Sequence, residues 1–242
     1  MRHAAYRLPL YVLVAALATT AASANERAIR KVFHDKYPDV VVDAVNKTRY
    51  AGLYEVVSRD QVVYTDANAS VVFLGRIIDA RTGKDLTFER RIDLGKVDFN
   101  ALPLELAFKR VKGNGARRMA IFADPDCPYC RQLEDGMTHV TDVTVYTFLF
   151  PIESIHPTAE ARARAIWCSG DPGAAWTALM LQGQVPAAAG EACDYPQERL
   201  ATLGARYNVT GTPTLVFSDG RRVPGYVGLE EFERLLGGPA HP

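Results

Sequence analysis

The sequence predicts an α/β protein in two parts, a small α+β unit followed by a larger domain of alternating strands and helices. Three observations lead to this division. The first part contains short β-type runs separated by turn residues, at 40–45, 53–58, 62–65 and 71–75. In the second part, helical patterns alternate with strand candidates at 118–123, 143–148, 214–217 and 222–226. The 242 residues suffice for two modest domains, each with its own core.

The composition is that of an ordinary soluble globular protein, with 48% hydrophobic and 23% charged residues. Lys and Arg together number 28, as do Asp and Glu, so the sequence predicts no strong field of either sign. We therefore expect neither nucleic acid nor an anionic membrane surface as the main partner.

Residues 1–24 have the pattern of a cleavable secretory signal peptide. Arg2 and Arg7 form a basic start, residues 8–18 form an apolar stretch, and Ala22-Ser23-Ala24 forms a small-residue cleavage site. The apolar stretch is short for a membrane span and is followed at once by charged residues, although an uncleaved membrane anchor remains the alternative. The pattern predicts export to an oxidising compartment.

After the leader, the sequence predicts an N-terminal domain at 25–93. Its first helix, over 26–37, carries Ile29 and Phe33 on one face and ends before Pro38. One helix and a small sheet bury little apolar area, so we expect this domain to gain stability by pairing with a second copy.

The sequence predicts a linker helix followed by a hinge at 94–115. Asn100 can cap such a helix, and Pro103 is tolerated because it lies in the first turn. Two glycines near residue 115 then end the helix and open the second domain, 116–242.

The motif that contains Cys127 and Cys130 is the main functional signal of the chain. It follows an apolar run at 119–123 and precedes a helical segment at 131–137. A strand, a CxxC motif and a helix in this order are typical of thioredoxin-like redox sites. Pro128 suits the first helical position, which places Cys127 at the helix N-terminus. Free N–H groups and the helix dipole stabilise a thiolate there, so we expect Cys127 to be the nucleophile and Cys130 its partner.

The alternative for this motif is half of a structural zinc site, since four cysteines could hold one zinc ion. The other two, Cys168 and Cys193, do not form a second CxxC, so we expect no metal and no cofactor. In an oxidising compartment they are most simply a structural disulfide, within a helical insertion at 157–207. Closing a loop of about 26 residues would stabilise the fold by roughly 3 kcal/mol. The two other pairings of four cysteines remain open.

Thr212 and Pro213 form the second functional signal. Pro213 comes directly before an apolar strand, where it has no N–H to donate, so we expect it at the strand start, as an edge residue or with a cis peptide bond. An ordinary turn proline is the alternative, but the CxxC motif upstream favours the cis bond. In a thioredoxin-like fold this position faces the CxxC motif, which leaves the Thr212 backbone free to pair with a peptide substrate. Pro128 and Tyr129, between the two cysteines, would shape the surface presented to that substrate.

Several polar residues flank these motifs. Asp126 lies directly before the proposed nucleophile, where a carboxylate should oppose thiolate formation unless it points to solvent. Asp124 is a further candidate for proton handling. His139 and His156 have no evident partner in the sequence and carry no functional prediction.

Taken together, several segments resemble the DsbC/DsbG family of periplasmic thiol:disulfide interchange proteins. These segments are the leader, the β-rich first part, Phe122-Ala123-Asp124 through Cys130, Ala165-Ile166-Trp167-Cys168, Gly211-Thr212-Pro213 and Val223-Pro224-Gly225-Tyr226. The resemblance implies a thioredoxin-like catalytic domain with a helical insertion, preceded by a cystatin-like dimerisation domain and a linker helix. It also implies a V-shaped homodimer whose two CxxC sites face a shared apolar cleft.

Two details bear on the branch within this family, and they point in different directions. The segment Trp167-Cys168 together with Cys193 resembles the DsbC branch, which has a second, structural disulfide, and this branch is favoured. The tetrapeptide CPYC, in contrast, matches the DsbG branch and some DsbC relatives.

The function that the resemblance implies is thiol:disulfide isomerisation of misoxidised exported proteins in the periplasm. A membrane reductase of the DsbD type would keep the CxxC pair reduced. One alternative is a general dithiol reductase or oxidase, which differs from an isomerase in redox potential. The other is a chaperone-like dimer whose cleft holds unfolded clients.

Overall fold

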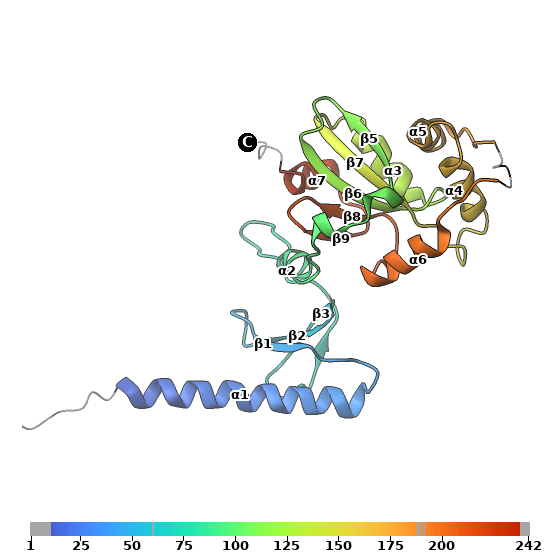
Figure 1. Cartoon of the computed structure of the whole chain (residues 1–242). Helices are drawn as coiled ribbons and strands as arrows, with labels where there is room; N and C mark the ends of the chain where they lie inside the picture. Colours follow the sequence, from blue (N-terminus) through green and yellow to red (C-terminus); the bar gives the residue numbers. More distant parts are fainter. Residues whose placement is uncertain (1–10, 60, 188–189, 191, 238–242) are drawn as a thin grey trace, which may run out of the picture. The chain divides into compact units, whose positions relative to one another are not determined.

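The chain separates into two compact units, Met1–Gly95 and Lys96–Pro242, each with its own β-sheet (Figure 1). The computed structural model describes residues 11–59, 61–187, 190 and 192–237, with side chains from residue 24 onward. The predicted signal peptide, 1–24, therefore falls almost entirely outside the described side chains. Among the helices of the described part, none combines the length and hydropathy needed to span a bilayer.

The first unit consists of a long helix, α1 (Tyr11–Lys36), an antiparallel sheet and a short helix, α2 (Leu86–Leu94). The sheet has its strands in chain order, β1 (Ala44–Lys47), β2 (Tyr54–Ser58), β3 (Gln61–Thr65) and β4 (Val72–Phe73). Ile29 and Phe33 of α1 are buried in one cluster with Tyr54 and Val56 of β2. The apolar face predicted for the first helix thus forms the core of this unit.

The linker helix predicted at 94–115 is not formed at those residues. A helix does precede the second unit, but it is α2, which begins where the Asp85 side chain accepts a hydrogen bond from the Phe88 N–H at 2.9 Å. The segment after it forms two short 3-10 turns, Phe99–Ala101 and Leu104–Leu106.

Pro103 explains why no α-helix continues through this segment. The residue before a proline is sterically driven out of the helical region, and Leu102 accordingly has extended angles, φ −70° and ψ 131°. Asn100 is not a helix cap either: its backbone N–H donates to the Asp98 side chain, which caps the first 3-10 turn.

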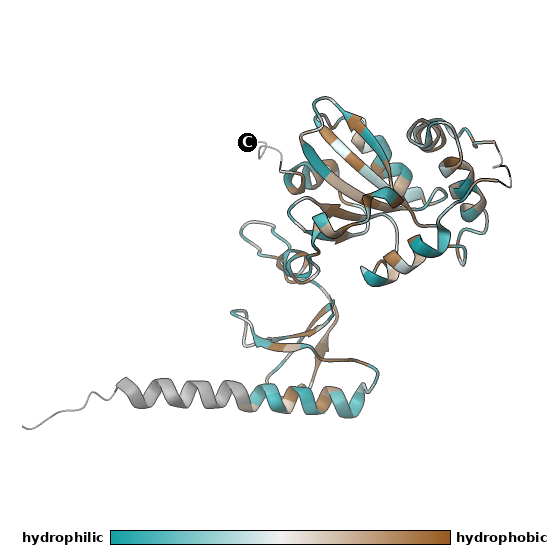
Figure 2. Cartoon of the chain, viewed as in Figure 1, coloured by the Kyte–Doolittle hydropathy of each residue, from teal (hydrophilic) through white to brown (hydrophobic). Residues whose placement is uncertain are grey.

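The second unit contains a five-stranded sheet in the order β5-β7-β6-β8-β9. Its strands are β5 (Phe108–Lys112), β6 (Arg117–Ala123), β7 (Val143–Leu149), β8 (Thr214–Phe217) and β9 (Arg222–Pro224). β6 pairs in parallel with β7, and the other pairs are antiparallel. Residues 119–123 of β6 are at most 2% exposed, as expected of a central strand covered on both faces. Figure 2 shows hydrophobic residues concentrated on the inner strands, whereas β5 at the edge is largely hydrophilic.

Within the part of this unit that the structure describes, five helices accompany the sheet, namely α3 (Pro128–Met137), α4 (Ala159–Trp167), α5 (Pro172–Gln182), α6 (Gln197–Arg206) and α7 (Leu229–Leu235). Three of them, α4 to α6, lie between β7 and β8 in the chain and form the predicted helical insertion. Trp176 and Met180 of α5 are each 2% exposed, so they are core residues.

The predicted boundary at 115/116 lies inside the second unit. β5 pairs with β7 along its whole length, and the turn after it is fixed by a 2.9 Å hydrogen bond from the Asn114 N–H to the Asp142 carboxylate. Gly113 in this turn has φ +57°, and a Cβ there would collide with Asp142. The glycines therefore serve a tight turn within the sheet, and the second unit begins at Lys96.

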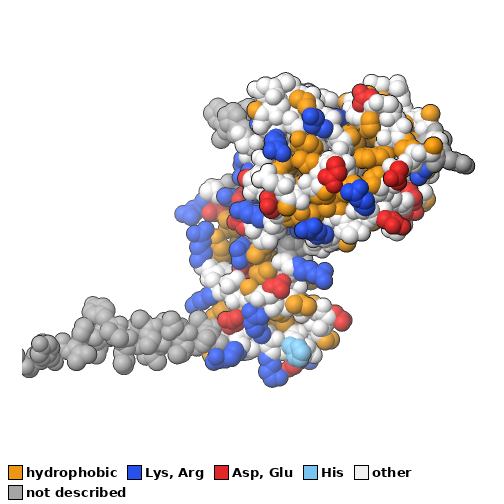
Figure 3. Space-filling view, in the orientation of Figure 1, with side chains coloured by type: hydrophobic (Ala, Val, Ile, Leu, Met, Phe, Trp, Pro, Cys, Tyr) orange, Lys and Arg blue, Asp and Glu red, His pale blue; other side chains and the backbone are white. Residues whose placement is uncertain are grey.

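Figure 3 shows basic and acidic side chains interspersed over the visible face of the described residues, with hydrophobic side chains between them. This face thus carries no extended patch of a single charge, as the balanced composition predicts.

Candidate active site

Cys127 is the N-cap residue of α3, directly after the turn that follows β6. It has extended backbone angles, φ −71° and ψ 121°, and Pro128 occupies the first helical position, where an N–H is not needed. Cys127 is 5% exposed and Cys130 is 2% exposed, and both are free thiols. The helix thus begins at the nucleophile predicted from the sequence.

The surroundings of Cys127 lower its pKa from 9.0 to about 5. The largest cause is a hydrogen bond from the Cys130 thiol, and the Thr212 side chain and the backbone N–H groups of Cys130 and Tyr129 act in the same direction. Burial opposes them. For Cys130 the pKa is instead raised, first by burial and then by the neighbouring Cys127. These shifts favour a thiolate at Cys127 and a protonated thiol at Cys130.

The Thr212–Pro213 segment faces this pair. Its peptide bond is cis, the isomer that the sequence predicts, and the Cys127 Sγ lies 3.2 Å from the Thr212 carbonyl oxygen. The sheet register brings the two together: Phe122 at the end of β6 pairs with Thr214 at the start of β8. The last residues of β6 and the first of β8 consequently lie side by side at one end of these two inner strands.

An accessible surface surrounds the buried sulfurs. Tyr129 is 58% exposed and Pro128 is also exposed, while Thr212 is partly exposed and Pro213 is buried. An extended chain docked here would contact the Tyr129 ring and could approach the Thr212 backbone.

Asp126 does not point freely to solvent. Its carboxylate forms an ion pair with Arg162 of α4 and accepts a 2.6 Å hydrogen bond from the Thr158 hydroxyl. Its charge is therefore offset by a cation, which weakens the opposition to the Cys127 thiolate expected from the sequence.

Asp124 and His156 form a contact that sequence reasoning missed. The Asp124 side chain is fully buried, and its Oδ2 lies 2.9 Å from His156 Nδ1. The same oxygen accepts a 2.7 Å hydrogen bond from the Ile152 N–H, and Oδ1 accepts one of 2.7 Å from the Asp126 N–H. His156 lies 32 positions from its partner, in a loop with no motif, so no spacing signal marks this pair.

Cys168 and Cys193 are joined in a disulfide with a Cα–Cα distance of 5.9 Å. The bond ties the end of α4 to the segment before α6, where the Trp167 ring also packs against Tyr195. Two thiols rather than four are therefore available at the CxxC motif, so the four-cysteine zinc site has too few thiolates.

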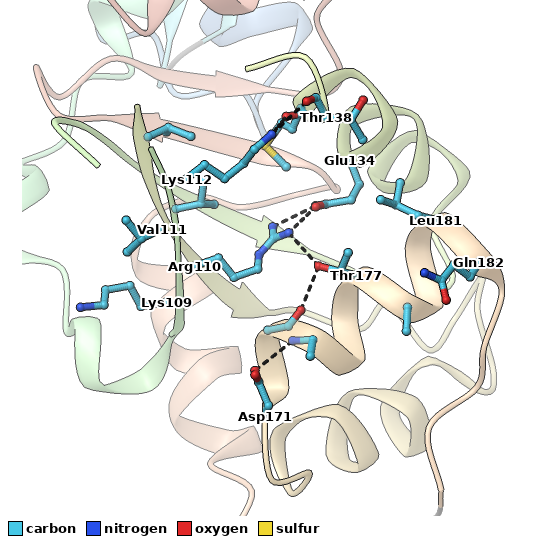
Figure 4. Close-up of a pocket in the computed structure, with 16 residues that line it drawn as sticks. Lys109, Arg110, Val111, Lys112, Glu134, Thr138, Asp171, Thr177, Leu181 and Gln182 are labelled. Atoms are coloured by element: carbon cyan, nitrogen blue, oxygen red, sulfur yellow. Dashed lines mark hydrogen bonds and ion pairs between the residues drawn. The ribbon is translucent and has the colours of Figure 1, made fainter. Parts of the chain in front are cut away.

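A cavity of about 570 Å³ lies at the far end of α3 and is not lined by either free cysteine (Figure 4). Arg110 of β5 lies between α3 and α5 there and forms a bidentate ion pair with the buried Glu134. Trp176 donates to the same carboxylate at 2.9 Å. These contacts join β5, α3 and α5, so the ion pair of Arg110 and Glu134 has a structural role.

Two family models match the chain. A thioredoxin-like domain matches residues 104–238, and the N-terminal domain of disulfide bond isomerase proteins matches residues 20–88.

Curated relatives and a solved structure agree with these models. A probable thiol:disulfide interchange protein DsbC of Bordetella parapertussis is 42% identical over 209 residues, which are 86% of this chain and 73% of the relative. The thiol:disulfide interchange protein DsbC of Escherichia coli is 27% identical over 188 residues, 77% of each chain. The crystal structure of a disulfide interchange protein from Neisseria gonorrhoeae matches 58% of this chain and 100% of its own, with 40% identity and a TM-score of 0.54.

Proposed function

Because the chain belongs to the DsbC family of thiol:disulfide interchange proteins, we propose that it rearranges incorrect disulfides in exported proteins through the dithiol of Cys127 and Cys130. The resemblance predicted from the sequence and the predicted fold class are confirmed, and so is the enzyme class, a thiol:disulfide oxidoreductase. The observation that supports the finer proposal is the position of Cys127 at the start of α3, with its Sγ 3.2 Å from the Thr212 carbonyl oxygen.

In the first step, the Cys127 thiolate attacks one sulfur of a substrate disulfide. A bond forms between Cys127 Sγ and that sulfur, the substrate S–S bond breaks, and the other substrate sulfur leaves as a thiolate. The low pKa of Cys127 keeps the attacking group ionised at neutral pH. The Thr212 and Pro213 segment, with Pro128 and Tyr129, would hold the substrate chain during this step.

In the second step, a different thiolate of the substrate attacks the substrate sulfur of the mixed disulfide. A new substrate disulfide forms and Cys127 leaves as a thiolate, so no net oxidation or reduction occurs. If the substrate stalls, Cys130 loses its proton and attacks Cys127 Sγ, which releases reduced substrate and an oxidised CxxC pair. Burial raises the pKa of Cys130, which slows this second route.

The release route leaves an oxidised CxxC pair and therefore needs a reductant. We propose that a membrane reductase of the DsbD type supplies it, and that the predicted signal peptide exports this chain to the periplasm. We also propose a homodimer formed by the N-terminal units. In support, β4 is an edge strand of its sheet, and Phe73 and the following Leu74 are 50% and 82% exposed. An exposed apolar edge strand is suited to pairing with another copy.

The lowered pKa of Cys127 favours the alternative of a dithiol oxidase. A Cys127 pKa of about 5 lies between the values of about 7 for a thioredoxin and about 3.5 for a strong oxidant. A stabilised thiolate favours the reduced form and makes the disulfide more oxidising.

The deciding experiment is recovery of activity from a disulfide-scrambled test enzyme in a glutathione buffer. We expect the wild-type chain to restore activity, Cys127→Ala to be inactive, and Cys130→Ala to retain part of the activity because it can still exchange through Cys127. Recovery by Cys127→Ala would refute the proposal. Suppression of client aggregation by the Cys127→Ala/Cys130→Ala variant would instead support the chaperone-like role.

A further inference from the structure

The buried Asp124 carboxylate ties the loop after β7 to the active-site turn. Through Oδ1 it accepts the Asp126 N–H, and through Oδ2 it accepts the Ile152 N–H and faces the His156 ring. The Asp124 backbone carbonyl also accepts the Cys127 N–H at 3.2 Å. The position of the nucleophile at the start of α3 consequently depends on how firmly Asp124 is held.

The contact with Asp124 fixes the orientation of the His156 ring. With Nδ1 directed at the carboxylate, Nε2 is left to accept or lose a proton. The side chain of His156 is 19% exposed, so protons can reach it from solvent. Within the described residues, Asp124 is the only hydrogen-bond partner recorded for this ring.

We propose that His156 is a positioning residue for the reaction of Cys127. It holds the Asp124 carboxylate in place, and it adds a titratable positive charge beside the residue whose backbone carbonyl accepts the Cys127 N–H. This inference rests on the proposed role of Cys127 as nucleophile. It concerns the thiolate itself, so it can be tested without any protein substrate.

His156 is positively charged together with an ionised Cys127 only over a defined pH range. The pKa of His156 is raised above its ordinary 6.5, first by the hydrogen bond to Asp124 and further by the charges of Cys127 and Asp126, against partial burial. Cys127 ionises near about 5. Between these two values the imidazolium and the thiolate are present together and stabilise one another.

Other ionisable groups surround the pair. Asp126 is matched by Arg162, and the pKa of Glu153 is raised by its hydrogen bond with Glu160. Tyr195 interacts with Asp124 and with both glutamates, and burial raises its pKa. A pH profile of the wild-type chain alone would mix these titrations, so the test compares variants that differ only at residue 156.

Two substitutions separate the charge of His156 from its hydrogen bond. His156→Asn places an amide N–H close to where Nδ1 lies and cannot titrate, whereas His156→Leu removes both the N–H and the charge. His139→Asn is the matched control, because His139 is an exposed histidine near the other end of α3.

The first readout is the rate of alkylation of Cys127 by iodoacetamide in the reduced full-length chain between pH 4 and 9, with the modified cysteine identified by mass spectrometry. We expect His156→Asn to react about two- to fivefold more slowly than wild type near pH 5, the size of effect of a partly screened charge, and equally fast at pH 9. His156→Leu should remain different at pH 9 as well. His156→Asn overlaying wild type and His139→Asn at every pH would overturn the proposal.

The second readout needs no substitution. In the oxidised chain Cys127 carries no charge, so the pKa of His156, followed by NMR of its ring, should be lower than in the reduced chain. Because coupling between two sites is reciprocal, this shift in the pKa of His156 should match the difference in the pKa of Cys127 between wild type and His156→Asn, taken from the pH profiles of alkylation. Equal His156 pKa values in both redox states would exclude the charge effect, whereas loss of isomerase activity alone would bear only on the proposed function.

Discussion

The Cys127 sulfur lies 3.2 Å from the backbone carbonyl of Thr212, although 85 positions separate the two residues in the chain. The contact results from the antiparallel pairing of β6 with β8, which sets the start of α3 beside the residue before Pro213. The proposed nucleophile and the backbone proposed to receive the substrate are therefore positioned by β6, the central strand of the sheet. A change in this strand should affect both at once.

The first prediction concerns the stability of the reduced protein as a function of pH. The pKa of Cys127 falls from 9.0 to about 5 on folding, so the folded state binds fewer protons than the unfolded state between these values. A lowered thiol pKa stabilises the fold fully above about pH 9, and this stabilisation is lost as the pH falls toward about 5. The raised pKa of Cys130 adds no slope here, because both its folded and unfolded forms are protonated below about pH 8.

The expected result is that the free energy of unfolding of the reduced chain, relative to the oxidised chain, rises by about 1.4 kcal/mol per pH unit between pH 5.5 and 8. Urea denaturation of both redox forms measures it. The oxidised chain is the control, since its CxxC cysteines do not titrate. Parallel pH profiles for the two forms would contradict a low Cys127 pKa.

The sequence predicts well those parts of the site whose chemistry is local. Cys127 at a helix start and Pro213 at a strand start follow from the proline and cysteine positions alone, because each property depends on a few adjacent residues. The order of strands and the helical insertion also follow from periodicity. These features carry their cause within a short window of sequence.

The features that the sequence did not reveal depend on contacts between distant residues. His156 meets Asp124 only because the chain after β7 folds back over the active-site turn, and the Ile152 N–H anchors that return. The misplaced linker helix has a different cause. The apolar residues of 94–115 have helical spacing, but Pro103 drives Leu102 into an extended conformation. The residues that follow form β5, which pairs with β7.

The second prediction concerns the cation beside Asp126. Arg162→Met would leave the Asp126 carboxylate uncompensated next to the thiolate, so the pKa of Cys127 should rise and its thiolate absorbance at 240 nm at pH 5 should fall about two- to fivefold. Adding Asp126→Asn to this variant should restore the wild-type titration. Arg199→Met is the control, because the Arg199 side chain is 64% exposed and pairs with Glu105. Indistinguishable titrations of Arg162→Met and Arg199→Met would show that Asp126 does not act on Cys127.

The third prediction concerns the buried ion pair shown in Figure 4. The Glu134 and Arg110 side chains are 7% and 17% exposed. Glu134→Ala therefore leaves the largely buried guanidinium with only the Thr177 hydroxyl, at 3.4 Å, and leaves the Trp176 N–H without an acceptor. We expect a loss of about 3–5 kcal/mol in the free energy of unfolding. Glu231→Ala, which breaks an exposed pair with Arg234, should lose less than about 1 kcal/mol. Urea denaturation compares the two, and similar losses would mean that the buried pair contributes no more than a surface pair.

The last prediction tests the proposed dimer through the edge of the first sheet. Leu74, next to β4, is 82% exposed within one chain, so replacing it should have little effect on the folding of a monomer. If two β4 edges pair, Leu74→Lys brings like charges together and weakens association by about tenfold or more, which sedimentation equilibrium can measure. Val111→Lys is the matched control, because Val111 is 53% exposed on β5 in the second unit.

At concentrations where Leu74→Lys is monomeric, recovery of a scrambled test enzyme should fall. Alkylation of Cys127 should stay unchanged, since the groups that contact this thiol all lie within the second unit. A Leu74→Lys chain that associates like wild type would move the dimer contact away from β4, and a monomeric chain with full recovery would show that isomerisation does not need two copies.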